Sequence, residues 1–442
     1  MPWVNRMKIA LYTLGCKVNQ YDTQAMRELL ENAGHECVEF EEHADVYLIN
    51  TCTVTGTGDK KSRQMISRAH ALNPEAKIVV AGCYAQRAPQ EVLALPGVDM
   101  VLGTKERASI VEKIASLDQA GTVNAVGDLR EENKFEEMSV SREGRTRAHL
   151  KIQEGCDRFC SYCIIPYARG PIRSRPLADI RRQMELLSAA GYPEIVLTGI
   201  HLMSYGKEWK NGITLLDAIR QADGLLNIQR IRLGSLEPQL LTEDFIAYLA
   251  NNKRVCRQFH LSLQSGSATV LKRMRRRYTP EEYMQCLAAL RGAMPDCAVT
   301  TDIIVGFPGE TEQEFQETLD FAREAKFSRI HVFPYSRRQG TPAYSMPGQL
   351  SRGEKAARAS RLIALGEELE KEHMRSYIGT KQNVLMEECQ GGVWQGYTDT
   401  YLRVYAHGAP EGENLSGKIM AVQIDEIRDL QLHGNIITKA EV

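Results

Sequence analysis

The chain has 442 residues, and at roughly 150 residues per domain this length predicts about three domains. Hydrophobic residues make up 43% of the sequence and charged residues 25%, a globular composition that excludes a mainly disordered or fibrous chain. Lys and Arg total 55 against 56 for Asp and Glu, so the formal net charge is -1. A nucleic-acid partner would therefore need a local basic surface.

The amino terminus lacks the basic segment, long apolar core and small-residue cleavage site of a secretion signal. The apolar stretches of the chain, such as 78–82 and 195–202, are far shorter than the roughly 20 residues of a membrane span. We expect a soluble, cytoplasmic protein without a membrane partner. Because the cytosol keeps thiols reduced, the 11 cysteines are better interpreted as ligands or reactive thiols than as disulfides.

Residues 1–130 alternate short apolar runs with amphipathic ones, which predicts an open parallel α/β sheet with helices on both faces. Strands are expected at 8–14, 45–50, 77–81 and 99–102, and helices at 23–33, 60–72 and 89–95. Residues 131–147 are polar and charged without a period that would bury one face. We interpret this segment as a linker.

Residues 148–375 contain six β-branched apolar runs separated by helical patterns, which predicts a partial (β/α)6 barrel. The expected strands are 148–153, 194–198, 229–234, 258–263, 298–305 and 329–334, and a long charged helix is expected within 351–377. Functional residues of such barrels lie at the carboxyl ends of the strands. Residues 376–442 predict a small all-β barrel of five short strands, at 384–387, 393–398, 401–405, 418–424 and 430–437.

The strongest chemical signal is a CxxxCxxC motif formed by Cys156, Cys160 and Cys163, directly after the first strand of the second domain. Three thiolates in one short loop can hold three irons of a [4Fe-4S] cube and leave the fourth iron open. A structural zinc site requires four closed ligands, and this loop has no fourth Cys or His. Unrelated core cysteines are the other alternative, but the loop is polar. The motif therefore favours a cluster with one open iron.

Three further cysteines, Cys16, Cys52 and Cys83, each follow the end of a predicted strand in the first domain. The carboxyl ends of strands in an open α/β sheet converge on one crevice. A single cysteine at such a position is often only a small buried hydrophobe. Three at equivalent positions favour a second [4Fe-4S] cluster.

The CxxxCxxC motif at the start of a six-unit βα domain resembles the radical S-adenosylmethionine (SAM) superfamily. The phrases LGCKVNQYDT, NTCTVT, AGCYAQ and GCDRFCSYCIIPYARG, followed by RSRP, extend the resemblance to the methylthiotransferases over essentially the whole chain. This resemblance implies a methylthiotransferase N-terminal domain with an auxiliary cluster (1–130), a radical SAM core (148–375) and an RNA-binding barrel similar to TRAM modules (376–442).

The resemblance also implies a mechanism. The open iron of the loop cluster would chelate one SAM, which yields a 5′-deoxyadenosyl radical. A second SAM would be the methyl donor, and sulfur would come through the auxiliary cluster. Candidate cofactor-binding residues follow the barrel strands: Thr198, Gly199, Ser235, Glu237, Gln264 and Asp302. Ordinary turn chemistry at strand ends is the alternative interpretation of these residues.

The run Lys17-Val18-Asn19-Gln20 after the first cysteine is most similar to the branch acting on N6-threonylcarbamoyladenosine at tRNA position 37. The isopentenyladenosine branch tends to have glutamine-methionine-asparagine there, and the branch acting on a ribosomal-protein aspartate has proline-lysine-asparagine. Both remain alternatives, as does a non-catalytic metal-dependent RNA-binding protein. The expected partners are a tRNA anticodon stem-loop, an electron donor of the flavodoxin or ferredoxin type and an unidentified sulfur donor.

Positive charge is concentrated in Arg173, Arg175 and the run 272–277, which we expect to neutralise tRNA phosphates. Tyr397, Tyr401 and Arg403 could stack on unpaired bases, whereas Trp394 is expected to pack the barrel core. Two sets of residues are assigned no role. Residues 56–62 lack the glycine that a phosphate loop requires, and isolated strand histidines are usually core residues. The histidines and remaining cysteines that are assigned no role are His201, His260, His331, Cys37, Cys256, Cys286, Cys297 and Cys389.

Overall fold

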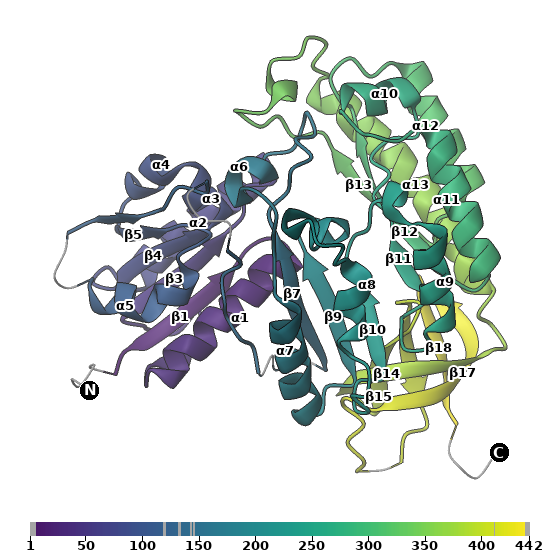
Figure 1. The fold of residues 1–442 in the computed structure, drawn as a ribbon, viewed down its shortest axis with the longest axis horizontal. Helices are drawn as coiled ribbons and strands as arrows, with labels where there is room; N and C mark the ends of the chain where they lie inside the picture. Colours follow the sequence, from purple (N-terminus) through teal and green to yellow (C-terminus); the bar gives the residue numbers. More distant parts are fainter. Residues whose placement is uncertain are drawn as a thin grey trace.

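The computed structural model describes residues 6–117, 121–130, 134–141, 144, 146–410 and 412–437. Its N-terminal part is a parallel sheet in the order β2-β1-β3-β4-β5-β6 (Figure 1). The strands are β1 (Lys8–Thr13), β2 (Glu36–Val38), β3 (Val46–Thr51), β4 (Lys77–Gly82), β5 (Val98–Leu102) and β6 (Val123–Ala125). The helices are α1 (Lys17–Asn32), α2 (Gly56–Leu72), α3 (Cys83–Arg87), α4 (Pro89–Leu93) and α5 (Ile110–Ala115), with a 3-10 turn at Arg107–Ser109.

Helices cover both faces of this sheet, as the sequence predicts. All six residues of β3 are buried, which is typical of a central strand in a doubly covered parallel sheet. Successive residues of β3 enter two separate cores: Tyr47 and Ile49 pack on one face, and Val46 and Leu48 on the other. The short edge strands β2 and β6 were missed from sequence because three residues carry too little periodicity.

The expected linker is more closely packed than its composition suggests. The structure assigns it no helix or strand before Arg147 in the part that it describes, and positions 131–133, 142, 143 and 145 lie outside that part. However, Phe135, Met138 and Val140 are 8%, 3% and 1% exposed, and the last two belong to the core of the next domain. The prediction that this segment buries no face is therefore wrong.

The middle of the chain is a partial barrel of six parallel strands in sequence order. One sheet has the order β8-β7-β9-β10, in which the two-residue β8 is antiparallel, and the other has the order β11-β12-β13. Isolated bridges from Ile231 to Val255 and from Leu236 to Leu261 join the two sheets. The strands are β7 (Arg147–Glu154), β8 (Arg173–Ser174), β9 (Glu194–Gly199), β10 (Arg230–Leu233), β11 (Gln258–His260), β12 (Ala298–Val305) and β13 (Arg329–Pro334).

Helices cover the outside of this barrel (Figure 1). Several begin with reciprocal capping boxes, such as Thr279 with Glu282, Thr311 with Glu314 and Ser351 with Glu354, which satisfy free backbone N–H groups. The helices are α6 (Ile165–Arg169), α7 (Leu177–Ala189), α8 (Leu215–Arg220), α9 (Glu243–Asn251), α10 (Ala268–Arg273), α11 (Pro280–Ala293), α12 (Glu312–Ala325) and α13 (Arg352–Arg375). Short 3-10 turns lie at Leu202–Ser204, Lys207–Trp209, Pro238–Leu240 and Pro342–Tyr344.

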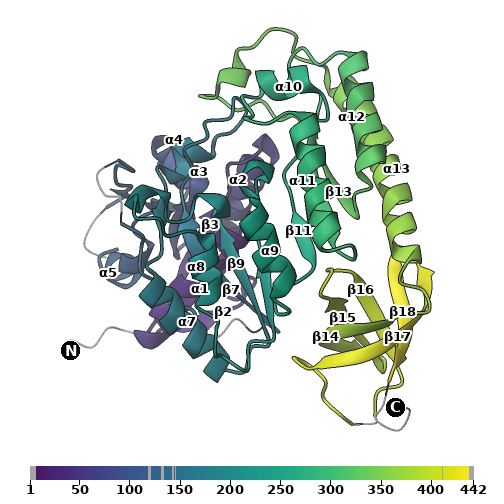
Figure 2. The ribbon, with the colours of Figure 1, turned by 45° about the vertical axis from the view of Figure 1, so that its right-hand side comes forward.

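The C-terminal part is a closed five-stranded barrel in the order β14-β15-β16-β18-β17, which confirms the predicted all-β unit (Figure 2). Its strands are β14 (Lys381–Gln390), β15 (Val393–Thr398), β16 (Arg403–His407), β17 (Ile419–Arg428) and β18 (Gln431–Ile436). Two arginines of β10 attach it to the central domain: Arg230 donates to the Asn383 carbonyl at 2.6 Å, and Arg232 to the Asp399 carbonyl at 2.8 Å. The barrel is thereby fixed beside β10.

Helix α1 lies between the N-terminal sheet and β7 and contributes to the cores of both (Figure 1). Met26 and Leu30 pack with the N-terminal sheet, whereas Tyr21 and Ala25 belong to the core of the central domain. The Tyr21 hydroxyl also donates to the Met138 carbonyl at 2.7 Å. None of the described helices combines the length and apolarity needed to span a membrane.

Candidate functional site

The CxxxCxxC loop is held in place by backbone geometry and hydrogen bonds. Gly155 has a φ of +75°, and a Cβ there would lie 1.8 Å from the Pro171 carbonyl oxygen, so only glycine fits at the turn out of β7. The Ser161 amide donates to the Met274 carbonyl at 3.0 Å, and its hydroxyl donates to the Arg273 carbonyl at 2.8 Å. These contacts fix the loop against the end of α10.

Cys156, Cys160 and Cys163, here called the loop trio, line a cavity together. Burial raises the pKa of Cys156 to about 11 and that of Cys163 to about 12. Arg276 donates from Nη1 to the Cys160 sulfur at 3.3 Å. A buried thiol of this kind loses its proton when metal binds, and a guanidinium suits the negative charge of the resulting thiolate.

The N-terminal cysteines follow three neighbouring strands. Cys16 is the N-cap of α1 after β1, Cys52 follows β3 directly, and Cys83 begins α3 after β4. Because β1, β3 and β4 are adjacent, these positions share one edge of the sheet. A Cβ at Gly15 would lie 3.2 Å from the Cys52 sulfur, so the first two loops touch. We call Cys16, Cys52 and Cys83 the strand-end trio.

Asn19 and Arg169 connect the three loops of the strand-end trio. The Asn19 amide nitrogen donates to the Leu14 carbonyl at 2.7 Å and to the Thr51 carbonyl at 2.9 Å, the residue before Cys52. Its side-chain oxygen accepts from Arg169, whose Nε donates to the Cys83 sulfur at 3.1 Å. Arg169 belongs to α6, which comes directly after the loop trio in the chain. The Arg169–Cys83 hydrogen bond therefore connects α6, and the loop trio before it, to the strand-end trio.

A buried ionic network surrounds Arg169. Asp22 and Glu154 pair with Arg107, Lys151 and Arg169, and the side chains of all five are at most 3% exposed. Burial alone would raise the pKa of Asp22 and of Glu154, but the surrounding cations outweigh burial and hold both below their ordinary values. Lys151 and Glu154 both face this network because the register of β7 shifts between residues 151 and 153.

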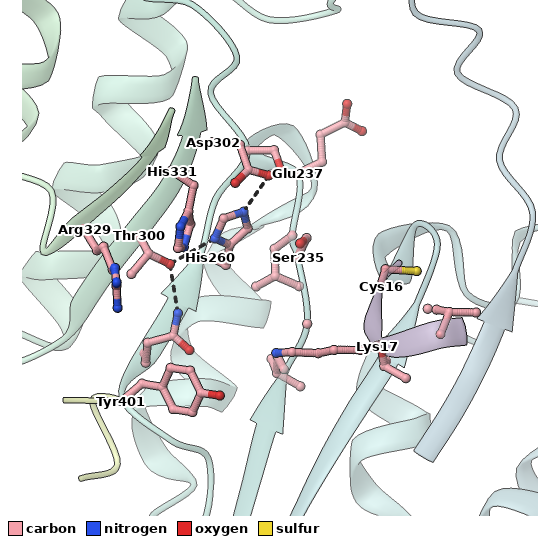
Figure 3. Close-up of a pocket in the computed structure, with 18 of the residues that line it drawn as sticks. Cys16, Lys17, Ser235, Glu237, His260, Thr300, Asp302, Arg329, His331 and Tyr401 are labelled. Atoms are coloured by element: carbon pink, nitrogen blue, oxygen red, sulfur yellow. Dashed lines mark hydrogen bonds and ion pairs between the residues drawn. The ribbon is translucent and has the colours of Figure 1, made fainter. Parts of the chain in front are cut away.

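A cavity of about 1070 Å³ lies where the three parts of the chain meet (Figure 3). The loop trio, Cys16 and Lys17 line it, together with Tyr397, Tyr401 and Arg403 of the C-terminal barrel. Ligand pockets typically span about 300–1,000 Å³. The cavity thus has room for a cofactor and a nucleoside together. Every candidate cofactor-binding residue also lines it: Thr198, Gly199, Ser235, Glu237, Gln264 and Asp302.

Glu237 anchors the loop trio through charged partners. Its carboxylate pairs with Arg158 of the cysteine loop at 2.7 Å, with Arg276 at 3.2 Å and with His201 at 3.0 Å. Burial would raise the pKa of Glu237, but the His201 hydrogen bond and the two arginines lower it to about 2. The residue is 3% exposed, so its main contacts are these cations.

Near Glu237 in the same cavity, His260 shares a hydrogen bond with Thr300 at 3.0 Å, and its ring lies 3.2 Å from the Asp302 carboxylate (Figure 3). Lys17 extends from the start of α1 into the same space. Burial lowers the pKa of Lys17, the Tyr401 hydroxyl opposes this shift, and Arg232 adds to it.

The expected phosphate-binding role is wrong for several arginines. Arg173 is 2% exposed and donates to the Arg169 carbonyl, and Arg175 is 0% exposed and pairs with Asp179. Arg276 contacts Cys160 and Glu237, as above. In the run 272–277 only Lys272, Arg275 and Arg277 are exposed, so they alone remain candidates for phosphate contact. Trp394 packs in the barrel core at 6% exposed, as predicted.

The cysteine donors fit iron–sulfur cubes in both chemistry and setting. Each trio offers three thiols and one buried arginine bonded to a sulfur, which suits an anionic cluster. In the described part of the chain, no three His, Cys, Asp or Glu side chains converge on a single metal ion. A cube places each thiolate on a different iron, so it does not require such convergence.

Sequence reasoning missed the residues that position these cysteines. Asn19 lies in the quoted LGCKVNQYDT phrase, but nothing in that phrase shows that its amide joins two loops. Arg107, Lys151, Glu154 and Arg169 were missed because charged residues are rarely buried unless paired, and their pairing depends on the tertiary fold.

The chain is similar to known proteins over nearly its whole length. The chain matches the models of the uncharacterized protein family UPF0004 over residues 8–103 and of the radical SAM superfamily over residues 150–322. It is 46% identical over 426 residues to the threonylcarbamoyladenosine tRNA methylthiotransferase MtaB of Bacillus subtilis, covering 94% of this chain and 93% of that protein. It is 36% identical to the tRNA-2-methylthio-N(6)-dimethylallyladenosine synthase of Alkaliphilus oremlandii, covering 97% and 93% of the two chains.

The fold is also similar to the radical SAM methyltransferase TsrM of Kitasatospora setae, solved with cobalamin and a [4Fe-4S] cluster bound. The TM-score is 0.57 at 19% identity, and the match covers 77% of each chain. Members of the radical SAM superfamily use SAM and a [4Fe-4S] cluster, which the loop trio is suited to hold. The family predicted from the cysteine phrases is confirmed: this chain is an enzyme that belongs to the radical SAM methylthiotransferases.

Proposed function

We propose that the enzyme converts N6-threonylcarbamoyladenosine at tRNA position 37 to its 2-methylthio derivative. The observation that carries this proposal is the shared cavity, which joins the loop trio, Cys16 of the strand-end trio and aromatic residues of the C-terminal barrel. Residues 1–130 would be the methylthiotransferase N-terminal domain, 148–375 the radical SAM core and 376–442 the RNA-binding barrel. The 46% identity to the Bacillus subtilis enzyme supports this substrate over isopentenyladenosine.

In this proposal the loop trio holds one [4Fe-4S] cluster and the strand-end trio a second. When bound, the clusters and SAM supply the one-electron and sulfur chemistry that no side chain provides at an aromatic C–H bond. Thr198, Gly199, Ser235, Gln264 and Asp302 would contact SAM from the strand ends. Glu237 would act through Arg158 and Arg276, which it holds against the cysteine loop.

The C-terminal barrel would bind the anticodon stem-loop. Tyr397 and Tyr401 stack on each other with centroids 5.0 Å apart and face the cavity, which suits a splayed adenosine and its neighbours. The exposed Lys272, Arg275 and Arg277 would contact phosphates. A flavodoxin or ferredoxin would supply electrons in the cytoplasm, where the proposed tRNA substrate resides.

The test is nucleoside mass spectrometry of tRNA from a strain lacking this enzyme. We expect the 2-methylthio derivative to disappear, N6-threonylcarbamoyladenosine to accumulate, and the wild-type gene to restore the product. A strain that keeps its full level of the derivative would overturn the proposal. Loss of methylthio-isopentenyladenosine instead would assign the enzyme to the other tRNA branch.

A further inference from the structure

The cavity contains one cation without an acidic partner. Arg158 and Arg276 pair with Glu237 at 2.7 and 3.2 Å. Arg329 lies 3.9 Å from Glu370, and Arg403 lies 3.7 Å from Glu388. Lys17 differs from these arginines. Its side chain forms no hydrogen bond or ion pair with any described residue, and its Nζ lies 5.8 Å from the centroid of the Tyr401 ring.

The surroundings of Lys17 carry a positive excess. Arg232 and Arg147 lie over the same Tyr401 ring, at 4.5 and 5.0 Å from its centroid. Their carboxylate partners, Glu194 and Glu387, are each engaged at 2.7 Å by these arginines. Lys17 is partly buried, and a partly buried ammonium among cations is destabilised unless an anion joins it. This corner of the cavity is therefore prepared for an anionic ligand.

The position of Lys17 matches the part of the substrate that carries such an anion. Lys17 directly follows Cys16, so it lies beside the strand-end trio. In adenine, C2 and C6 flank the same ring nitrogen, so the N6 substituent lies near the carbon that receives sulfur. A threonylcarbamoyl substituent ends in a carboxylate, whereas an isopentenyl substituent is uncharged. Figure 3 shows Lys17 extended across this space toward Tyr401.

We propose that Lys17 is the specificity-determining residue of this enzyme, binding the threonyl carboxylate of the substrate through its ammonium group. This inference rests on the proposed function. A charge-assisted hydrogen bond to a carboxylate contributes roughly tenfold to hundredfold in affinity.

The experiment compares anticodon stem-loops that carry threonylcarbamoyladenosine, its threonyl carboxamide or isopentenyladenosine. Binding to the reconstituted enzyme is measured by fluorescence anisotropy, and methylthiolation by mass spectrometry. For the wild-type enzyme we expect the carboxylate to bind roughly tenfold to hundredfold tighter than the neutral carboxamide. For Lys17→Gln this ratio falls to near one, and for Lys17→Arg most of it is kept.

Lys8→Gln is the matched control, because Lys8 is exposed at the opposite end of β1 and should keep the wild-type ratio. Wild-type enzyme that binds carboxylate and carboxamide equally overturns the inference without any variant. A Lys17→Gln enzyme that keeps the wild-type ratio also overturns it. Failure of the wild-type enzyme to methylthiolate any threonylcarbamoyl stem-loop instead contradicts the proposed function, and that result is distinct from either binding outcome.

Discussion

Each cysteine trio brings three thiols together, but the two trios do so by different structural means. The loop trio occupies eight consecutive positions, and its geometry comes from one turn, fixed by Gly155 and by the bonds of Ser161. The strand-end trio is spread over 68 residues, from 16 to 83, and its geometry comes from the order of three parallel strands. The first is encoded locally, whereas the second depends on the whole domain and on buried polar contacts around it.

Removing each trio in turn should produce the largest effects and distinguish their roles. In the triple alanine variant of Cys156, Cys160 and Cys163, we expect about four irons where the wild-type enzyme reconstitutes about eight, with loss of both SAM cleavage and product. In the triple alanine variant of Cys16, Cys52 and Cys83, iron also halves and product is lost, but SAM cleavage remains. Iron analysis and chromatography of 5′-deoxyadenosine measure these outcomes.

Double replacement of Cys37 and Cys389 by alanine is the control, since neither lies in a trio, and it should keep full iron. Full turnover by the strand-end variant would show that only the loop trio is needed. The proposal that both trios hold clusters needed for the reaction would then be wrong.

The next largest effect is expected for Asn19→Asp, which should disturb the strand-end trio and leave the loop trio intact, because Asn19 supports only the strand-end trio. The substitution keeps the shape but replaces a donor to two carbonyls by an anionic oxygen, leaving both acceptors unsatisfied at a cost of about 1–3 kcal/mol each. We expect iron to fall toward about four per chain while SAM cleavage persists. Asn32→Asp, exposed at the end of the same helix, should retain the wild-type iron content. Equal loss of both functions would argue against a local role.

The same contrast explains how much of the site the sequence could predict. The loop trio follows from spacing alone, and the strand-end trio follows once the strand order is inferred, because cysteines after neighbouring strands must share an edge. The roles of Asn19 and Arg169 could not be inferred, since their partners are backbone atoms and sulfurs brought together by folding. Arg175 shows the opposite error. Its basic neighbours in the sequence suggested contact with RNA phosphates, but the fold buries its side chain.

The success of fold prediction also depends on whether an element is encoded locally or by the tertiary fold. The strands with long apolar runs, such as β3 and β12, were predicted within one residue. The five barrel strands were also predicted, but β14 and β17 extend three to four residues beyond their expected bounds. The elements missed were short, such as β8 and α6, whose conformation depends on neighbours rather than on periodicity. Arg169 is the last residue of α6, so the least predictable helix carries the contact that joins the two trios.

Lysine substitutions at the two arginines should tune one cluster each, with a smaller effect than cysteine loss. Arg169→Lys and Arg276→Lys keep the positive charge but lose the guanidinium bond to Cys83 or Cys160. Hydrogen bonds to the sulfurs raise a cluster's reduction potential. We expect each variant to lower the potential of its own cluster by a tenfold change in the reduction equilibrium, about 59 mV. Potentiometric titration followed by electron paramagnetic resonance measures this shift. Equal shifts of both clusters in either variant would mean that the arginines act through the shared network.

The smallest effect concerns acid sensitivity of the contacts that hold the cysteine loop. The pKa of Glu237 is about 2 in the folded enzyme against an ordinary 4.5, because the His201 hydrogen bond and two arginines outweigh its burial. A lowered folded-state pKa stabilises the protein fully above the ordinary value, and this stabilisation is lost as pH falls from about 4.5 toward about 2. The melting temperature of the metal-free protein should therefore fall over this range in the wild type and fall less steeply in Glu237→Gln. Glu243→Gln, at the exposed start of α9, should follow the wild-type curve. Parallel curves for Glu237→Gln and the wild type would mean that the carboxylate contributes no pH-dependent support to the loop, so that Gly155 and Ser161 alone would have to account for its fixed geometry.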